Sequence, residues 1–258
     1  MDAGIIQGLR VSHASLVARL HGFSDADAAE PSLLAGWTRG MLVAHLSSAA
    51  SAAMRCVDAA AAGETVPMYT GGEAQRDAEI EAGRHAPAAT LVDELVDVSQ
   101  RLDEGLASLP DQAWETPMLS RRGPIPMRVV VVQRWIDVEA HHVDLGLGYS
   151  PKDWPQQFID VALPATMQVF PALRQRPDAD RSIIGSWGVV REDGPGAWGL
   201  QADADDARPC APTDVDCEIR GAGSTLLAIL LGRDPGEPPT LAGDTTLAAA
   251  LKRAFPGP

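Results

Sequence analysis

The segment 127–147 constrains this chain most, because it joins a helical repeat to a cluster of metal-binding side chains. It begins with the apolar run Val129–Val132 and ends in imidazoles and carboxylates. At about 100° per residue, steps of three and four residues return to one side of a helix. One face of the predicted helix therefore carries four polar residues: Arg134, Asp137, His141 and Asp144.

This helix offers two alternative pairs of ligands. Asp137 and His141 stand four residues apart, whereas Glu139 and His142 stand three apart on a different face. We favour the first pair because a four-residue step gives two side chains the closer common direction. In the alternative interpretation, Asp137 pairs with Arg134 or with solvent and the histidines are packed for structural reasons.

His45 is the candidate third ligand. It lies on a helix predicted from the N-cap Thr38 to about residue 62, where Gly63 ends it, among small and apolar residues. Two imidazoles and one carboxylate, with one coordination position open, form the ligand set of a catalytic rather than a structural zinc site. Taken alone, a histidine in such surroundings is more often a hydrogen-bonded core residue than a ligand, so the assignment depends on the Asp137 and His141 pair.

The first half of the chain predicts a bundle of long helices. Apolar residues recur with a helical period between Leu91 and Leu109, which indicates one buried helix face. An up-and-down four-helix bundle can aim metal ligands inward from facing helices. The four predicted helices cover residues 5–21, 39–62, 88–109 and 127–147. His13 and His21 lie on or near the first of them, and we interpret each as a surface or capping histidine rather than a ligand.

In the second half of the chain, the long helical repeats give way to short strand patterns. This half predicts a short sheet with helices on one side. We therefore predict a two-domain α+β protein, with a helical domain at 1–153 and a small α+β domain at 154–258. The predicted strands are 182–191, 197–202 and 214–220, and the predicted helices are 156–175, 225–231 and 245–254.

Composition and charge exclude several classes of function. The net charge of -14 disfavours nucleic acid and anionic membranes, since both reward basic residues. There is no apolar run long enough to span a membrane and no evident secretory signal. The three cysteines, Cys56, Cys210 and Cys217, suit free thiols in a reducing compartment. These features predict a cytoplasmic protein.

Four segments together resemble the mycothiol-dependent maleylpyruvate isomerase family. They are Leu33–His45, Pro67–Tyr69, Arg134–Gly146 and Leu230–Arg233, and they occur in the family's order across nearly the whole chain. The resemblance implies a DinB-like four-helix metal-binding domain, followed by a small α+β domain resembling sterol carrier proteins.

The resemblance also implies roles for individual residues. Zinc would be held by His45, Asp137 and His141, although the family usually has Glu where this chain has Asp137. The shorter aspartate retracts its carboxylate by one methylene. Arg233 would correspond to the family's catalytic arginine, and Tyr69 and Arg233 would contact the thiol cosubstrate.

The implied reaction is a thiol-dependent isomerisation. Mycothiol, activated by zinc or another divalent metal, would add to the cis double bond of maleylpyruvate. Rotation and elimination would then give fumarylpyruvate. Two alternatives stay open: a transferase that moves mycothiol or a related thiol onto another electrophile, for instance in natural-product biosynthesis, and a non-enzymatic ligand-binding module.

Overall fold

The chain forms two compact units, Met1–Tyr149 and Ser150–Pro258. The structure is a computed structural model and describes residues 2–120 and 123–257. The first unit is mainly helical and the second contains a five-stranded sheet, which confirms the predicted combination of a helical part and a sheet-containing part. The functional domains at 1–153 and 154–258 remain a prediction.

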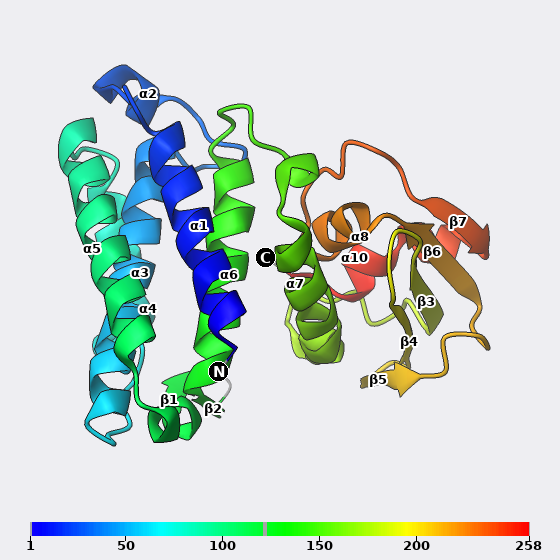
Figure 1. The fold of residues 1–258 in the computed structure, drawn as a ribbon. Helices are drawn as coiled ribbons and strands as arrows, with labels where there is room; N and C mark the ends of the chain where they lie inside the picture. Colours follow the sequence, from blue (N-terminus) through cyan, green and yellow to red (C-terminus); the bar gives the residue numbers. More distant parts are fainter. Residues whose placement is uncertain (1, 121–122, 258) are drawn as a thin grey trace. The chain divides into compact units, whose positions relative to one another are not determined.

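Four long helices lie side by side in the first unit (Figure 1). Both α1 and α3 pack against α5 and α6, so the four helices surround a common core. The DinB-like up-and-down topology stays a prediction. The long helices are α1 (Ala3–Arg19), α3 (Arg39–Ala61), α5 (Ala88–Ser108) and α6 (Met127–Asp144). The shorter elements are α2 (Asp25–Ala29), α4 (Gly72–Ala82), the 3-10 helix η1 (Asp111–Glu115), and the hairpin β1 (Pro117–Ser120) and β2 (Gly123–Pro126).

Local sequence explains where these helices begin and how they pack. The Thr38 hydroxyl accepts a hydrogen bond from the Met41 amide at 3.2 Å and so caps the start of α3. The predicted apolar face of α5 is buried as a continuous stripe. Gly83, just after α4, lies so close to α3 that an added Cβ would stand 2.3 Å from the Cβ of Ala44. A glycine is therefore required there to keep α4 against α3.

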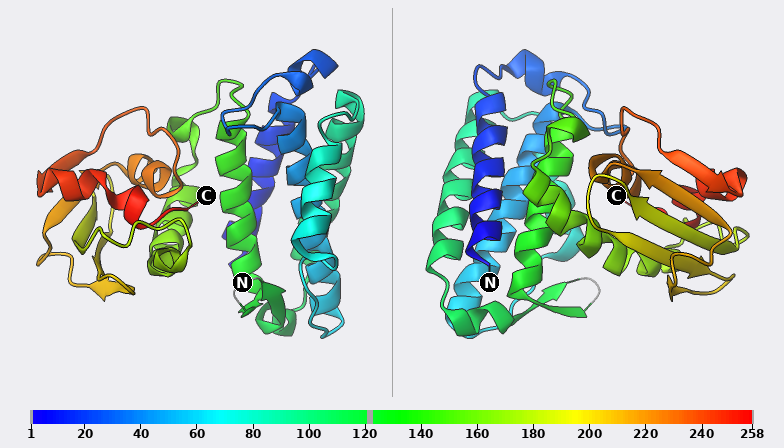
Figure 2. Two further views of the ribbon diagram at one scale, coloured as in Figure 1. Left: turned by 180° about the vertical axis from the view of Figure 1, so that it is seen from behind. Right: turned by 45° about the vertical axis from the view of Figure 1, so that its right-hand side comes forward.

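The second unit is built on a sheet with strand order β5-β4-β3-β6-β7. The central pair β3 and β6 is parallel and the other pairs are antiparallel. Helix α8 packs on β3 and β6, and α7 packs on α8 (Figure 2). The strands are β3 (Gly185–Arg191), β4 (Ala197–Ala202), β5 (Ala207–Cys210), β6 (Cys217–Gly221) and β7 (Thr240–Gly243). The helices are η2 (Pro151–Asp153), α7 (Gln156–Val169), η3 (Phe170–Gln175), α8 (Gly223–Leu230), α9 (Thr245–Ala249) and α10 (Leu251–Ala254).

Several element boundaries differ from the sequence prediction. The sequence did not predict β5 and β7, which are both short edge strands of four residues. The helix predicted over 245–254 divides at Ala250 into α9 and α10. The helix predicted over 127–147 ends at Asp144, because Gly146 adopts a φ of 65° that closes the helix.

The cysteines are free, as predicted. Burial raises the pKa of Cys56 to about 11 and that of Cys217 to about 12. Both are therefore neutral thiols at physiological pH, which makes neither a reactive thiolate.

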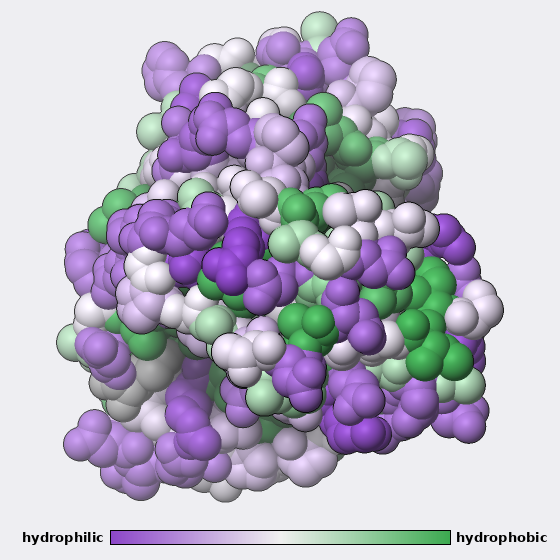
Figure 3. Space-filling view, turned by 90° about the vertical axis from the view of Figure 1, so that its right-hand side faces the viewer, coloured by the Kyte–Doolittle hydropathy of each residue, from purple (hydrophilic) through white to green (hydrophobic). Residues whose placement is uncertain are grey.

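No helix in the described part of the chain combines the length and apolar character needed to cross a membrane. Figure 3 shows a largely hydrophilic face on which apolar residues form small separate patches. The strongly acidic composition agrees with such a face.

Candidate metal site

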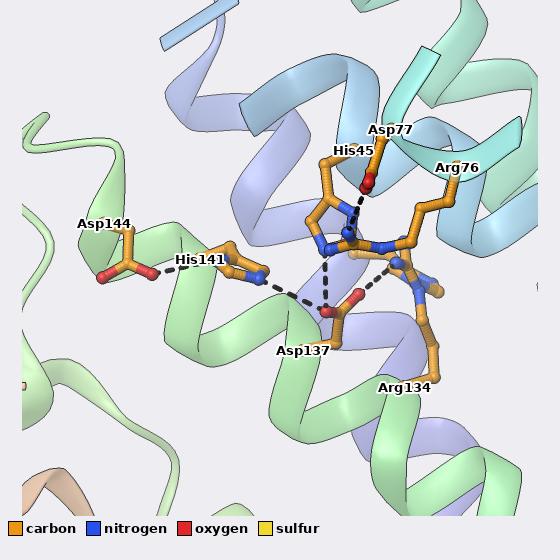
Figure 4. A network of polar contacts seen from close by, with 8 residues as sticks. His45, Arg76, Asp77, Arg134, Asp137, His141 and Asp144 are labelled. Carbon is orange, nitrogen blue, oxygen red and sulfur yellow. Dashed lines mark hydrogen bonds and ion pairs between the residues drawn. The ribbon is translucent and has the colours of Figure 1, made fainter. Parts of the chain in front are cut away.

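Three of the predicted residues meet at one point inside the first unit. His45 comes from α3, and Asp137 and His141 come from α6 one turn apart (Figure 4). One potential ligand atom from each lies within 4.8 Å of the other two. The packing of α3 on α6 therefore brings together residues that are 92 positions apart in the chain.

Two distances within this cluster match the separation between two ligands of a tetrahedral metal ion. Oδ1 of Asp137 lies 3.2 Å from Nε2 of His45 and 3.4 Å from Nε2 of His141. Two ligand atoms each bound about 2.0–2.2 Å from one tetrahedral ion lie roughly 3.3 Å apart. Two imidazoles and one carboxylate also match the ligand types of a catalytic zinc site. The residues present therefore fit a zinc ion.

The two histidines differ in how their second nitrogen is held. Nδ1 of His141 lies 2.8 Å from Oδ2 of the buried Asp144, which leaves Nε2 for a metal. Such carboxylate–histidine pairs orient metal ligands and raise their basicity. Nδ1 of His45 is buried and has no hydrogen-bond partner among the described residues. His141 is therefore the better oriented of the two candidate ligands.

The protonation states of the cluster suit metal binding. Burial favours the neutral form of Asp137, but His45 and then His141 outweigh burial and hold the pKa of this carboxyl well below its usual value. Burial lowers the pKa of His45, although Asp137 opposes that change. For His141 burial acts in the same direction, but hydrogen bonds with Asp137 and Asp144 raise its pKa above the usual value. A metal would bind anionic Asp137 and displace a proton from His141.

The alternative pair on α6 has a different environment. Glu139 is buried and accepts hydrogen bonds from the hydroxyls of Ser12 and Tyr149. The ring of His142 stacks on Tyr149, with centroids 3.6 Å apart and planes 5° apart. Glu139 and His142 are thus held by α1 and by the residues after α6, and neither belongs to the three-residue cluster.

Tyr69 lies in the loop between α3 and α4. Arg55 donates a hydrogen bond to the carbonyl of the adjacent Met68 at 3.0 Å and so fixes this loop to α3. Burial raises the pKa of Tyr69, which keeps its hydroxyl protonated. Helix α4 also contributes Arg76, whose side chain extends toward His45 (Figure 4).

Arg233 belongs to the second unit and follows the end of α8. Its guanidinium donates a hydrogen bond to the carbonyl of Leu231, and Lys252 donates to the neighbouring carbonyl of Leu230 at 2.9 Å. Both cations therefore lie where a helix presents unpaired carbonyls and a partial negative charge. The functional role of Arg233 stays a prediction.

Two residues around the cluster were not recognised from the sequence as part of the site. Arg134 was considered only as an alternative partner of Asp137, and His13 was interpreted as a surface or capping histidine. That interpretation of His13 is wrong, because its side chain is buried and 2% exposed. It lies beside Arg134, which donates to Asp137. The signal available in the sequence was the position of His13 within the helical apolar repeat of α1.

Replacing Asp144 with alanine should weaken zinc binding by roughly 10–100-fold, because His141 loses the carboxylate that orients its ring. Competition between the protein and a chromophoric chelator would measure the change. Asp144→Asn keeps an oxygen that can accept from Nδ1 and should lose less. Equal zinc affinity in the alanine variant and the wild type would contradict this role.

The fold and the site define a protein with one helical and one sheet-containing unit, whose helical unit carries a cluster of two histidines and one carboxylate. Residues 9–146 match the family described as the mycothiol maleylpyruvate isomerase N-terminal domain. The match covers more than half of the chain. The chain therefore belongs to this family, as its sequence motifs predicted.

Two solved structures share the fold. A crystal structure of the mycothiol-dependent maleylpyruvate isomerase is 23% identical, with a TM-score of 0.74 over 93% of this chain and 92% of that one. A crystal structure of a histidine-to-alanine mutant of that isomerase is 22% identical, with a TM-score of 0.73 and the same coverage. No curated protein matches the chain.

Proposed function

We propose that this chain isomerises maleylpyruvate, or a close analogue, to its trans isomer fumarylpyruvate, with mycothiol as the thiol and zinc as the metal. The observation that carries the proposal is the convergence of His45, Asp137 and His141 in a member of this family. The same three ligands suit other divalent ions, so zinc is the first metal to test.

The protein's side chains would prepare the site for a thiol. A divalent ion held by His45, Asp137 and His141 would lower the pKa of a bound thiol and so favour its thiolate at neutral pH. Asp137 contributes the single negative charge among the three ligands. With only three protein residues at the cluster, a bound ion would remain accessible to the thiol. His45 is buried and Asp137 is partly buried, and reduced access of water strengthens each of these electrostatic interactions.

We assign contacts with the thiol cosubstrate and with a substrate carboxylate to Tyr69 and Arg233. Tyr69, which stays protonated, can donate a hydrogen bond to the thiol cosubstrate. Arg233 is permanently charged and presents a planar fork that matches a carboxylate. In a chain with a net charge of -14, a dianionic substrate needs such local cations.

The test combines metal analysis with an assay of maleylpyruvate conversion in the presence and absence of mycothiol. We expect one zinc ion per chain and conversion that strictly requires the thiol. Zinc without conversion would overturn the isomerase proposal. It would support instead the transfer of a thiol to another electrophile, the alternative favoured by Asp137 in place of the family's usual glutamate. A protein without metal would contradict both and leave a ligand-binding module.

A further inference from the structure

A buried chain of hydrogen bonds reaches Asp137 from two other helices. On α6, Nη1 of Arg134 donates to Oδ2 of Asp137 at 2.9 Å. Nε of the same guanidinium lies 3.3 Å from Nε2 of His13 on α1. Nδ1 of His13 in turn lies 2.8 Å from Oδ1 of Asp103 on α5. The side chains of Arg134 and His13 are 3% and 2% exposed, so solvent does not compete for these bonds.

The direction of each bond in this chain is fixed by chemistry. A guanidinium only donates, so Nε2 of His13 must accept and carry no hydrogen. The hydrogen of the imidazole then sits on Nδ1 and is donated to Asp103. Burial lowers the pKa of His13, Asp103 opposes this and Arg134 adds to it, which agrees with a neutral ring. His13 thus holds Arg134 in one orientation, while Asp103 holds His13.

This orientation decides which oxygen of Asp137 is available. Arg134 occupies Oδ2, whereas Oδ1 faces the nitrogens of His45 and His141 at 3.2 and 3.4 Å. A carboxylate held in this way offers one oxygen to a metal and cannot rotate to offer both. The shorter aspartate needs such a hold, since its carboxylate must stand at a defined distance from an ion bound by two histidines.

We infer that His13 and Arg134 are positioning residues that fix Asp137 as a one-oxygen metal ligand, through a relay that begins at Asp103. The inference rests on the proposed function, because it assumes that the three-residue cluster binds a metal. A purely structural network would instead serve only to join α1, α5 and α6. The two roles differ in one respect: only a positioning relay changes the metal's coordination when it is cut.

Substitution of His13 tests this inference, because it removes the hydrogen bond between His13 and Arg134. The quantities to measure are the affinity for zinc and the absorption spectrum of the Co²⁺-loaded protein. His13→Leu removes the acceptor for Arg134, whereas His13→Gln retains an amide oxygen near the position of Nε2. We expect His13→Leu to weaken zinc binding by roughly 10-fold, the lower end of the 10–100-fold loss for a direct partner of a metal ligand, because His13 reaches Asp137 only through Arg134. His13→Gln should recover most of this loss. In protein loaded with Co²⁺, whose visible absorption reports ligand geometry, the leucine variant should show an altered spectrum.

A second variant keeps the test valid if His13→Leu does not fold. Arg134→Lys retains the positive charge, but a single ammonium cannot reproduce the fork that contacts His13 and Asp137 together. It should also weaken zinc binding and alter the Co²⁺ spectrum. Arg128→Lys is the matched control on α6, because Arg128 is 49% exposed and pairs with the exposed Glu115. This control should bind zinc like the wild type.

The outcomes separate this inference from the function it rests on. If the wild type binds no metal, both the proposed function and the positioning role of His13 and Arg134 are contradicted. If the wild type binds zinc, and the His13→Leu and Arg134→Lys variants match its affinity and Co²⁺ spectrum, the relay alone falls. Thermal unfolding of the metal-free variants tests for a purely structural role. Lower stability with unchanged zinc affinity would also overturn the positioning role.

Discussion

Replacing His45 with alanine is expected to abolish tight zinc binding and thiol-dependent turnover together. The change leaves Asp137 and His141, and two residues on one helix cannot enclose an ion at a cluster that is formed between α3 and α6. The loss in affinity should exceed the roughly 10–100-fold loss that follows removal of an outer partner. Zinc analysis of the purified variant and chelator competition would measure it.

Thermal unfolding gives an independent measure of the same change. A ligand that binds only the folded state at about 100 times its Kd stabilises that state by about 2.7 kcal/mol. Added zinc should therefore raise the Tm of the wild type and leave that of His45→Ala unchanged. His21→Ala, at an exposed position after α1, is the matched control and should respond like the wild type. A His45→Ala variant that keeps both zinc binding and turnover would contradict the proposed site.

A related pair of substitutions distinguishes the two acidic residues of α6. Asp137 and Glu139 are both carboxylates on this helix, two residues apart, but only Asp137 faces the two histidines of the cluster. Asp137→Asn should therefore lose zinc, because an amide carries no negative charge. Glu139→Gln should keep it, since Glu139 accepts from Ser12 and Tyr149 instead. Zinc loss in the second variant alone would favour the alternative ligand pair.

The grouping of His45, Asp137 and His141 could be predicted, because two of the three share one helix and the third depends on a sequence motif. Asp137 and His141 share one face of a single helix, and the helical period alone reveals this. His45 carries no such signal, and its assignment depended on a second cluster and on the family's motifs. The structure brings His45 to that pair through the packing of α3 on α6.

The contacts that hold Asp137 in place could not be predicted from the sequence, for a physical reason. Arg134 and His13 lie 121 positions apart, and their contact depends on the packing of α1 against α6. Asp103 looks like any polar residue on the exposed side of an amphipathic helix. Its side chain is nevertheless only 13% exposed and lies against His13. Periodicity identifies the face of a helix, but not which helix will cover that face.

The fold of the second unit was only partly predictable for a similar reason. The strands β3, β4 and β6 were recognised, whereas the edge strands β5 and β7 were not. Each edge strand is four residues long, and β5 contains Pro209, which cannot donate to a ladder. Such segments form strands because an adjacent strand pairs with them, so the signal lies in their neighbours.

Replacing Arg233 with alanine is expected to lower turnover by roughly 10²–10³-fold, the usual cost of removing one preorganised group that stabilises developing negative charge. Zinc content should not change, because Arg233 is not among the three proposed ligands. Steady-state kinetics with mycothiol and maleylpyruvate, together with metal analysis of the same preparation, would measure both quantities.

Matched variants show whether the effect of Arg233 comes from its fork or only from its charge. Arg233→Lys keeps the charge but loses the planar pair of donors, so it should recover only part of the turnover if the arginine binds a carboxylate through two bonds. Arg253→Ala removes an exposed arginine of α10 that pairs with Asp180, and it should leave turnover unchanged. Full activity in Arg233→Ala would exclude a role in the reaction. Loss of zinc in that variant would show that Arg233 acts on the metal site itself, contrary to the role proposed for it.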